Sequence, residues 1–217
     1  MSKPRSDYHH GDLRAALIKA ADEIIAEGGV EAFSLRVAAK RAGVSHAAPA
    51  HHFGSARGLL TEVAKLAFDR CFSYIQAGAH PDNVVANVRG VSLGFIKFAL
   101  DNPGHYRLMF RNDLTDKDDP HLREAIVRPG WRLGESILAY KGRAAAERGS
   151  FGDAADVLAG VATLHGVVDL ILDGGASNIF QMSGERDFAG QHLVKFLEHV
   201  YPDPTLVAGG REGQRPS

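Results

Sequence analysis

Polar side chains that suit phosphate groups and base edges are concentrated near residue 50, in the stretch SHAAPAHHFGSAR. Hydroxyl, imidazole and guanidinium groups can bond to phosphate oxygens or to the edges of bases. The small residues between them permit a close approach to another surface, and little in the stretch suits a buried core. The composition therefore predicts an external anionic partner. The residues assigned to this contact are Ser45, His46, Ala47, Ala50, His51, His52 and Arg57.

A metal site is the alternative explanation for the three histidines of this stretch. His46 and His51 are five residues apart, and this spacing does not place them on one face of a helix. Zinc ligands have closer spacing, with a cysteine or a carboxylate alongside. We therefore expect no metal and no other cofactor.

Short helical segments surround the histidine-rich stretch. Apolar residues recur three and four positions apart after Asp12, the expected N-cap, and Gly28 ends that helix. Ser34 is the expected cap of a second helix, and Gly43 allows the sharp turn that follows it. We expect Ser45 to cap a third helix.

Two short helices joined by a tight turn are typical of a helix-turn-helix, whose second helix enters the major groove of DNA. Two residues outside the stretch join the expected DNA contacts, namely Ser34 and Arg36. Tyr8 lies in an N-terminal arm that either touches the DNA backbone or frays. Arg36 has an equally simple alternative, a solvated arginine on a helix.

The charge of the chain is nearly balanced, at a formal net −1, but it is unevenly distributed. Residues 30–60 hold four basic side chains and one acid, which favours a confined anionic partner. The single cysteine, Cys71, excludes a disulfide within the chain and suits a reducing cytoplasm. We see neither a secretory signal nor an apolar run of about 18 residues, so we expect a cytoplasmic protein without a membrane partner.

Longer helices are predicted for the rest of the chain, one of them over about residues 121–146, and no stretch has the alternation typical of a strand. Residues 151–175 are apolar on most of the helix circumference, and a final helix is expected near residues 185–199. Their apolar faces exceed what one small domain needs, which favours a seam between two copies of the chain. A buried hairpin within one chain is the alternative. The composition after Pro202 predicts a disordered tail.

Two segments resemble the DNA-binding half of TetR-type (TetR/AcrR) transcriptional regulators, namely SLRVAAKRAGVSHAAPAHHFGSARGLL and the preceding YHHGDLRAALIKAA. Later segments, NPGHYRLMF and LHGVVDLILDG, are similar to the ligand-binding domain of a subgroup with a Trp-His-Gly motif. The resemblance implies an all-α protein, and it favours a DNA contact for Tyr8. An N-terminal three-helix helix-turn-helix domain over residues 1–55 would precede a helical domain for ligand binding and dimerisation over residues 56–202, and residues 203–217 would form the tail.

The resemblance also implies an effector pocket for a small, mostly apolar molecule. Aromatic, thioether and imidazole side chains on the later helices are the expected lining as a group, although for each one taken alone a place in the core is the better explanation. These residues are Phe72, Phe95, Tyr106, Met109, Phe110, Trp131 and His165. For His165, packing against Asp169 and a place at the dimer seam are further alternatives.

The sequence departs from the family pattern at three positions. Ala50 stands where the family has a tyrosine that reaches a backbone phosphate, and Ala56 stands where it has a lysine. Leu164 replaces the tryptophan of the Trp-His-Gly motif. The loss of two phosphate anchors implies a weaker or more specialised DNA binder.

The sequence thus predicts a homodimeric transcriptional repressor that binds a palindromic, double-stranded operator and is released by a small, mostly apolar effector. An enzyme is the first alternative, but no catalytic triad order, carboxylate pair or phosphate-binding loop stands out, so no catalysis is expected. The second alternative is a degenerate family member with weak or no specific DNA binding that acts through a protein partner.

Overall fold

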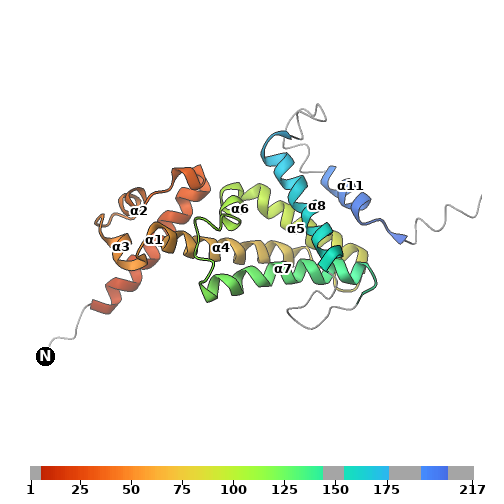
Figure 1. The fold of residues 1–217 in the computed structure, drawn as a ribbon, viewed down its shortest axis with the longest axis horizontal. Coiled ribbons are helices and arrows are strands. Elements are labelled where there is room, and N and C mark those ends of the chain that lie inside the picture. Colours follow the sequence, from red (N-terminus) through yellow and green to blue (C-terminus); the bar gives the residue numbers. More distant parts are fainter. Residues whose placement is uncertain (1–5, 144–153, 176–191, 205–217) are drawn as a thin grey trace, which may run out of the picture. The chain divides into compact units, whose positions relative to one another are not determined.

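The computed structural model describes residues 6–143, 154–175 and 192–204, and all regular structure in these ranges is helical, which confirms the all-α prediction (Figure 1). Side chains are described from residue 13 onward. The elements are α1 (Ser6–Gly28), the 3₁₀ turn η1 (Val30–Ala32), α2 (Leu35–Arg41), α3 (Ala48–Phe53), α4 (Ala56–Ala77), α5 (Val84–Asp101), α6 (Pro103–Met109), α7 (Pro120–Tyr140), α8 (Ala154–Leu172) and α11 (Leu193–Val200).

The chain divides into two compact units. The first comprises Met1–Arg70 and Asp101–Val127, so it combines α1, α2 and α3 with the first part of α4, with α6 and with the start of α7. The second comprises Cys71–Leu100 and Arg128–Ser217. This division describes packing, and the functional boundary expected at residue 55 stays a prediction.

The core of the first unit is built on the apolar stripe of α1, as the three-and-four spacing predicts. Its fully buried side chains, at 0 % exposure, include Leu17, Ala21, Ile25, Ala38, Ala39, Leu59, Val63 and Leu108. The helix begins at Ser6, so the expected cap at Asp12 is wrong. Gly11, the only glycine before Asp12, is tolerated inside a helix and does not stop it.

In the second unit, glycines allow α4 and α5 to pack backbone against backbone. A Cβ atom added to Gly78 would overlap the carbonyl oxygen of Gly90, and one added to Gly94 would overlap the carbonyl oxygen of Tyr74. Any larger residue at these positions would force the two helices apart. The close packing fixes the position of α4 against α5, and it therefore fixes the outer surface that the two helices form together.

Helix α8 is long and apolar, but little of it is buried. The window Ala155–Leu172 has a mean hydropathy of 1.7, which by length and composition alone would allow it to cross a membrane, and 28 % of it is buried. Leu158 is 67 % exposed and Leu170 is 42 % exposed. Much of this apolar face therefore lies outside the core of a single chain.

The ends of the later helices differ from the prediction in part. Helix α7 ends at Tyr140, whereas residues 121–146 were the expected range, and Pro129 lies inside it. A helix ending at Tyr140 is followed by a turn with positive φ at Gly142, which stops it earlier than expected. Helix α11 starts at Leu193, and residues 185–191 and the tail residues 205–217 lie outside the described residues.

Candidate nucleic-acid interface

The turn between α2 and α3 has the geometry that the sequence predicts. The Ser34 hydroxyl caps α2 by accepting a hydrogen bond from the Val37 N–H at 3.2 Å. Gly43 has a φ of 68°, in the left-handed region where only glycine is free of strain. Its N–H donates to the Lys40 carbonyl at 3.2 Å, and the Val44 N–H donates to the Ala39 carbonyl at 3.0 Å. The chain thus reverses sharply after α2.

The start of α3 differs from the prediction. Ser45 does not cap the helix, because α3 begins at Ala48 and Ala47 precedes it without a side-chain cap. Instead, the Ser45 carbonyl accepts from the Ala48 N–H at 3.1 Å, which closes an extra turn before the helix. Pro49 lies in the first turn of α3 and is buried, so it anchors the helix.

The side chains before and along α3 form an exposed surface of small residues and histidines. The exposed members are Ser45, His46, Ala47, Ala50 and His51. His52 differs from them, because it is half-buried and lines a pocket of about 200 Å³ together with Arg14 and Phe53. The outward surface therefore holds five of the residues expected within the histidine-rich stretch.

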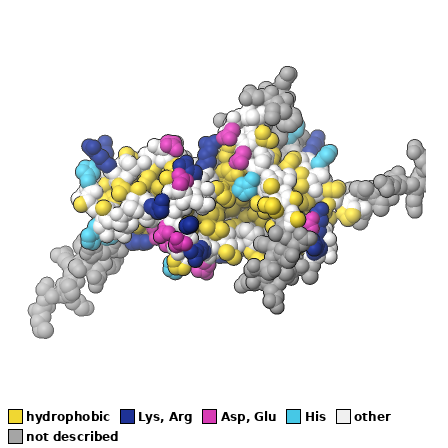
Figure 2. Space-filling model, viewed as in Figure 1, with side chains coloured by type: hydrophobic (Ala, Val, Ile, Leu, Met, Phe, Trp, Pro, Cys, Tyr) yellow, Lys and Arg dark blue, Asp and Glu magenta, His cyan; other side chains and the backbone are white. Residues whose placement is uncertain are grey.

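Positive charge lies beside this surface. On the face shown in Figure 2, the end of the first unit that carries α2 and α3 displays Lys, Arg and His side chains, and acidic side chains gather farther along the unit. Arg36 and Lys40 are exposed on α2. Arg41 is bound to Glu27 at 2.6 Å, and this hydrogen bond lowers the pKa of Glu27. Arg36 and Lys40 are thus better placed than Arg41 to meet an anion.

Three further predicted contacts have other partners or positions. Arg57 is exposed, and one of its guanidinium nitrogens donates to the Asp113 carbonyl at 3.0 Å. Tyr8 belongs to the first turns of α1 and not to an extended arm, and its side chain lies outside the described residues. Ser34 uses its hydroxyl as the cap of α2.

The loop between α6 and α7 is fastened to one face of α4, directly after α3. Besides Arg57, Thr61 accepts from the Asp116 N–H at 2.8 Å, and the Lys65 ammonium lies 3.5 Å from an Asp119 carboxylate oxygen. These α4 residues are four apart, so they share a helix face. Asp116 and Asp119 thus line the same pocket as His52, a relationship that the sequence did not reveal.

A polar cluster connects three helices of the first unit. Asp22 of α1 accepts from Arg70 of α4 at 2.5 Å and from Nε2 of His105 of α6 at 2.9 Å. Burial opposes ionisation of Asp22, but the hydrogen bonds from His105 and Arg70 prevail and lower its pKa. A close contact accompanies the cluster, because a Cβ atom on Gly104 would overlap the Ile25 carbonyl oxygen. Helix α6 is therefore fixed to α1.

The residues expected to line the effector pocket belong to both units. Tyr106, Met109 and Phe110 lie in the first, where the Tyr106 and Phe110 rings are 5.3 Å apart. The members in the second unit are Phe72, Phe95, Trp131 and His165.

Within the second unit, the Phe95 and His165 rings are 5.1 Å apart, and the Arg128 guanidinium lies 4.5 Å from the Phe72 ring centre. Burial lowers the pKa of His165, and the charge of Asp169 opposes that shift. The neutral imidazole is thus favoured, and neutral imidazole both donates and accepts hydrogen bonds.

Comparison with known proteins gives two family matches and several structural ones. Residues 17–63 match the model of bacterial regulatory proteins of the tetR family, and residues 88–196 match a tetracyclin repressor-like C-terminal domain. No curated protein matches the sequence.

Two solved structures indicate the same fold. A protein with unknown function from Rhodococcus sp. RHA1 is 24 % identical, with a TM-score of 0.64 and coverage of 90 % of this chain and 98 % of that chain. The TetR family transcriptional regulator PfmR from Thermus thermophilus is 18 % identical, with a TM-score of 0.57 and coverage of 93 % of this chain and 97 % of that chain. At these identities the likeness concerns the fold alone.

Proposed function

Because the chain belongs to the TetR family of transcriptional regulators, we propose that it is a repressor that reads a palindromic operator through α3. The observation that carries this proposal is the exposed surface of Ala47, Ala50, His46 and His51 directly after the Gly43 turn. Alanine methyl groups suit the methyl group of thymine, and imidazole nitrogens can bond to base edges or phosphates. Arg36 and Lys40 would add phosphate contacts.

The operator is expected to be palindromic because the protein is proposed to act as a homodimer. The apolar face of α8 supports a dimer, since Leu158 and Leu170 are exposed on a helix that is mostly unburied in one chain. A second copy of the same face would cover these side chains. The α3 helices of the two copies would then meet half-sites about one helical turn of DNA apart.

The proposed effector is a small, mostly apolar molecule held by the residues assigned above to the pocket, with His165 as a polar group. The Leu-His-Gly sequence at residues 164–166 is proposed to correspond to the Trp-His-Gly motif of the subgroup. Release from DNA requires that the effector bind the DNA-incompetent conformation more tightly than the DNA-bound one. No catalytic role is proposed for any residue, and the proposed compartment is the cytoplasm.

The first test is selection from a random duplex library with ligand-free protein at moderate salt. Enrichment of a palindrome would support the proposal and supply the operator. Fluorescence anisotropy with that operator then compares His51→Ala, expected to weaken binding to all sequences, with His46→Ala, expected to change the preferred bases. His121→Ala, an exposed histidine on α7, is the control. If neither change on the α3 surface affects binding, α3 is not the reading element.

A degenerate binder that acts through a protein partner remains the competing proposal, motivated by Ala50 and Ala56. Both side chains are exposed, so Ala50→Tyr with Ala56→Lys can restore the two family anchors without disturbing the core. If the native chain selects no DNA even at low salt, where phosphate contacts are strongest, and the double variant does, the native chain has lost DNA reading. If the native chain selects a specific DNA sequence without these substitutions, this alternative is excluded.

A further inference from the structure

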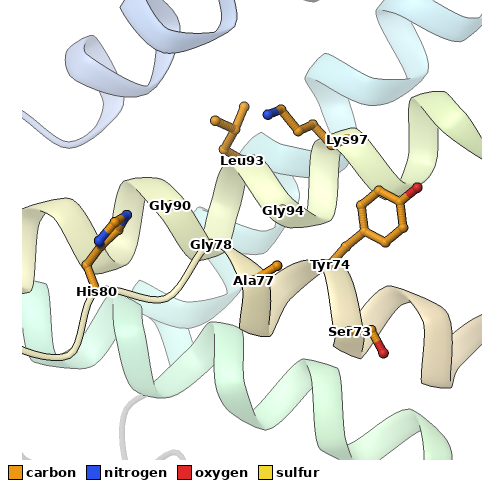
Figure 3. Close-up of a pocket in the computed structure, with 9 residues that line it drawn as sticks. All are labelled: Ser73, Tyr74, Ala77, Gly78, His80, Gly90, Leu93, Gly94 and Lys97. Carbon is orange, nitrogen blue, oxygen red and sulfur yellow. The ribbon is translucent and has the colours of Figure 1, made fainter.

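A groove on the second unit, between the end of α4 and the middle of α5, holds none of the residues assigned to the effector. It has a volume of about 410 Å³, within the range of small-molecule sites. Figure 3 shows Tyr74 and Ala77 on the α4 side, Leu93 and Lys97 on α5, and His80 near Gly90 at the other end.

The glycines of the groove are explained by helix packing and are not themselves evidence for a ligand. Gly78, Gly90 and Gly94 are required because the two backbones touch. The glycines nevertheless shape the groove, because they leave a floor without side chains between the Tyr74 ring and the Leu93 side chain. This floor would accept a narrow hydrocarbon chain.

The charge on the α5 side of the groove is the observation that points to a ligand class. Lys97 lines the groove and is exposed, and within the described ranges no hydrogen bond or ion pair engages its ammonium group. Lys97 follows Gly90 by seven residues, so its Cα lies about 10 Å along α5 from the His80 end, and Figure 3 shows its side chain turned back toward Leu93. The groove is thus elongated, apolar along its floor and cationic on the α5 side.

We propose that this groove binds a small amphiphilic carboxylate. The carboxylate accepts hydrogen bonds from the Lys97 ammonium, and the hydrocarbon chain lies over the glycine floor toward His80. Apolar burial supplies most of the affinity, and the ammonium sets the orientation. A single ammonium matches the one negative charge of a monocarboxylate better than the roughly two charges of a phosphate monoester. The inference does not depend on the proposed DNA-binding function.

The test is isothermal titration of the full-length protein at low salt with octanoate, and with octanol as the uncharged probe. Octanoate is expected to bind measurably and octanol about fivefold more weakly, as suits one partly exposed ion pair. Lys97→Met keeps the apolar stem and is expected to remove this difference. Lys19→Met changes an exposed lysine on α1 and is expected to leave both affinities unchanged.

A second variant tests the location of the apolar part. Ala77 is exposed and lines the groove, so Ala77→Trp can fill it without disturbing the core and is expected to abolish binding of both probes. Circular dichroism checks that each variant is folded. The proposal is overturned if octanoate gives no heat at millimolar concentration at any of several temperatures, if octanol binds equally well, or if either groove variant binds octanoate like the native protein.

Discussion

His105 and Asp22, 83 residues apart in the sequence, are joined by a 2.9 Å hydrogen bond that links α6 to α1. His105 is 1 % exposed and Asp22 is 22 % exposed, so the histidine side of this bond is shielded from water. Its Nδ1 is buried and has no hydrogen-bond partner among the residues that the structure describes, which leaves Nε2 as the nitrogen that connects the helices. Helix α6 therefore belongs mechanically with the helix-turn-helix of the first unit.

Asp22→Asn is expected to destabilise the protein by about 1–3 kcal/mol, because the Arg70 charge loses its partly buried counterion. The amide has nearly the same shape as the carboxylate, so the change tests charge and not volume. Urea unfolding at pH 7 measures the free energy. Glu124→Gln, at an exposed position of α7, is the control, and an equal loss in both variants would contradict the argument.

The same carboxylate predicts a pH dependence. The folded-state pKa of Asp22 is lowered from 3.8, so its contribution to stability is fully present above the unfolded pKa and is lost as pH falls through the folded value. The stability difference between the native protein and Asp22→Asn is therefore expected to be constant from neutral pH down to about pH 5 and to shrink below about pH 4. Urea unfolding across this range is the measurement. A difference that persists undiminished at the lowest pH would mean that Asp22 is not the titrating group.

Two glycines provide a matched test of the turn between α2 and α3. A Cβ atom at Gly43 or at Gly130 would meet nothing within 4 Å, but Gly43 has a φ of 68° and Gly130 lies within α7. Gly43→Ala is expected to destabilise by about 1 kcal/mol through backbone strain, and Gly130→Ala to stabilise by up to about 1 kcal/mol. Thermal unfolding compares them, and effects of the same sign would refute the conformational explanation.

Cys71 is expected to be unreactive in the native protein. Burial raises the pKa of its thiol to about 12, and the thiolate is the reactive form. Alkylation by iodoacetamide at pH 8 should be slow in the folded state and rapid in urea. Labelling at the same rate in both states would show that α4 opens readily at this position.

Local features of the site were predictable from the sequence, whereas the long-range contacts of its side chains were not. The cap at Ser34 and the turn at Gly43 follow from residue type and near neighbours, and both predictions are confirmed. Ser45 was expected to cap α3 because serine is a common N-cap, but an additional turn separates it from the helix. Capping preference alone does not distinguish these two local conformations.

Long-range contacts explain most of the rest. Arg57 was expected to face phosphate, and its bond to the Asp113 carbonyl depends on a loop 56 residues away. The link between Asp22 and His105 spans a greater separation still. Neither periodicity nor motif spacing reports such pairs. Likewise, the groove beside Lys97 arises from the crossing of two helices and carries no signal in either one alone.

The grouping of α6 and the start of α4 with the first three helices limits how this protein can be re-engineered. Residues 1–55 by themselves would lack Leu59 and Val63, which are fully buried, and the α6 backbone that contacts Ile25. A chimaera built from that fragment would expose the apolar face of α1 to water. Moving the helix-turn-helix unit to another protein therefore requires two separate segments of the chain. This is harder than joining one continuous segment.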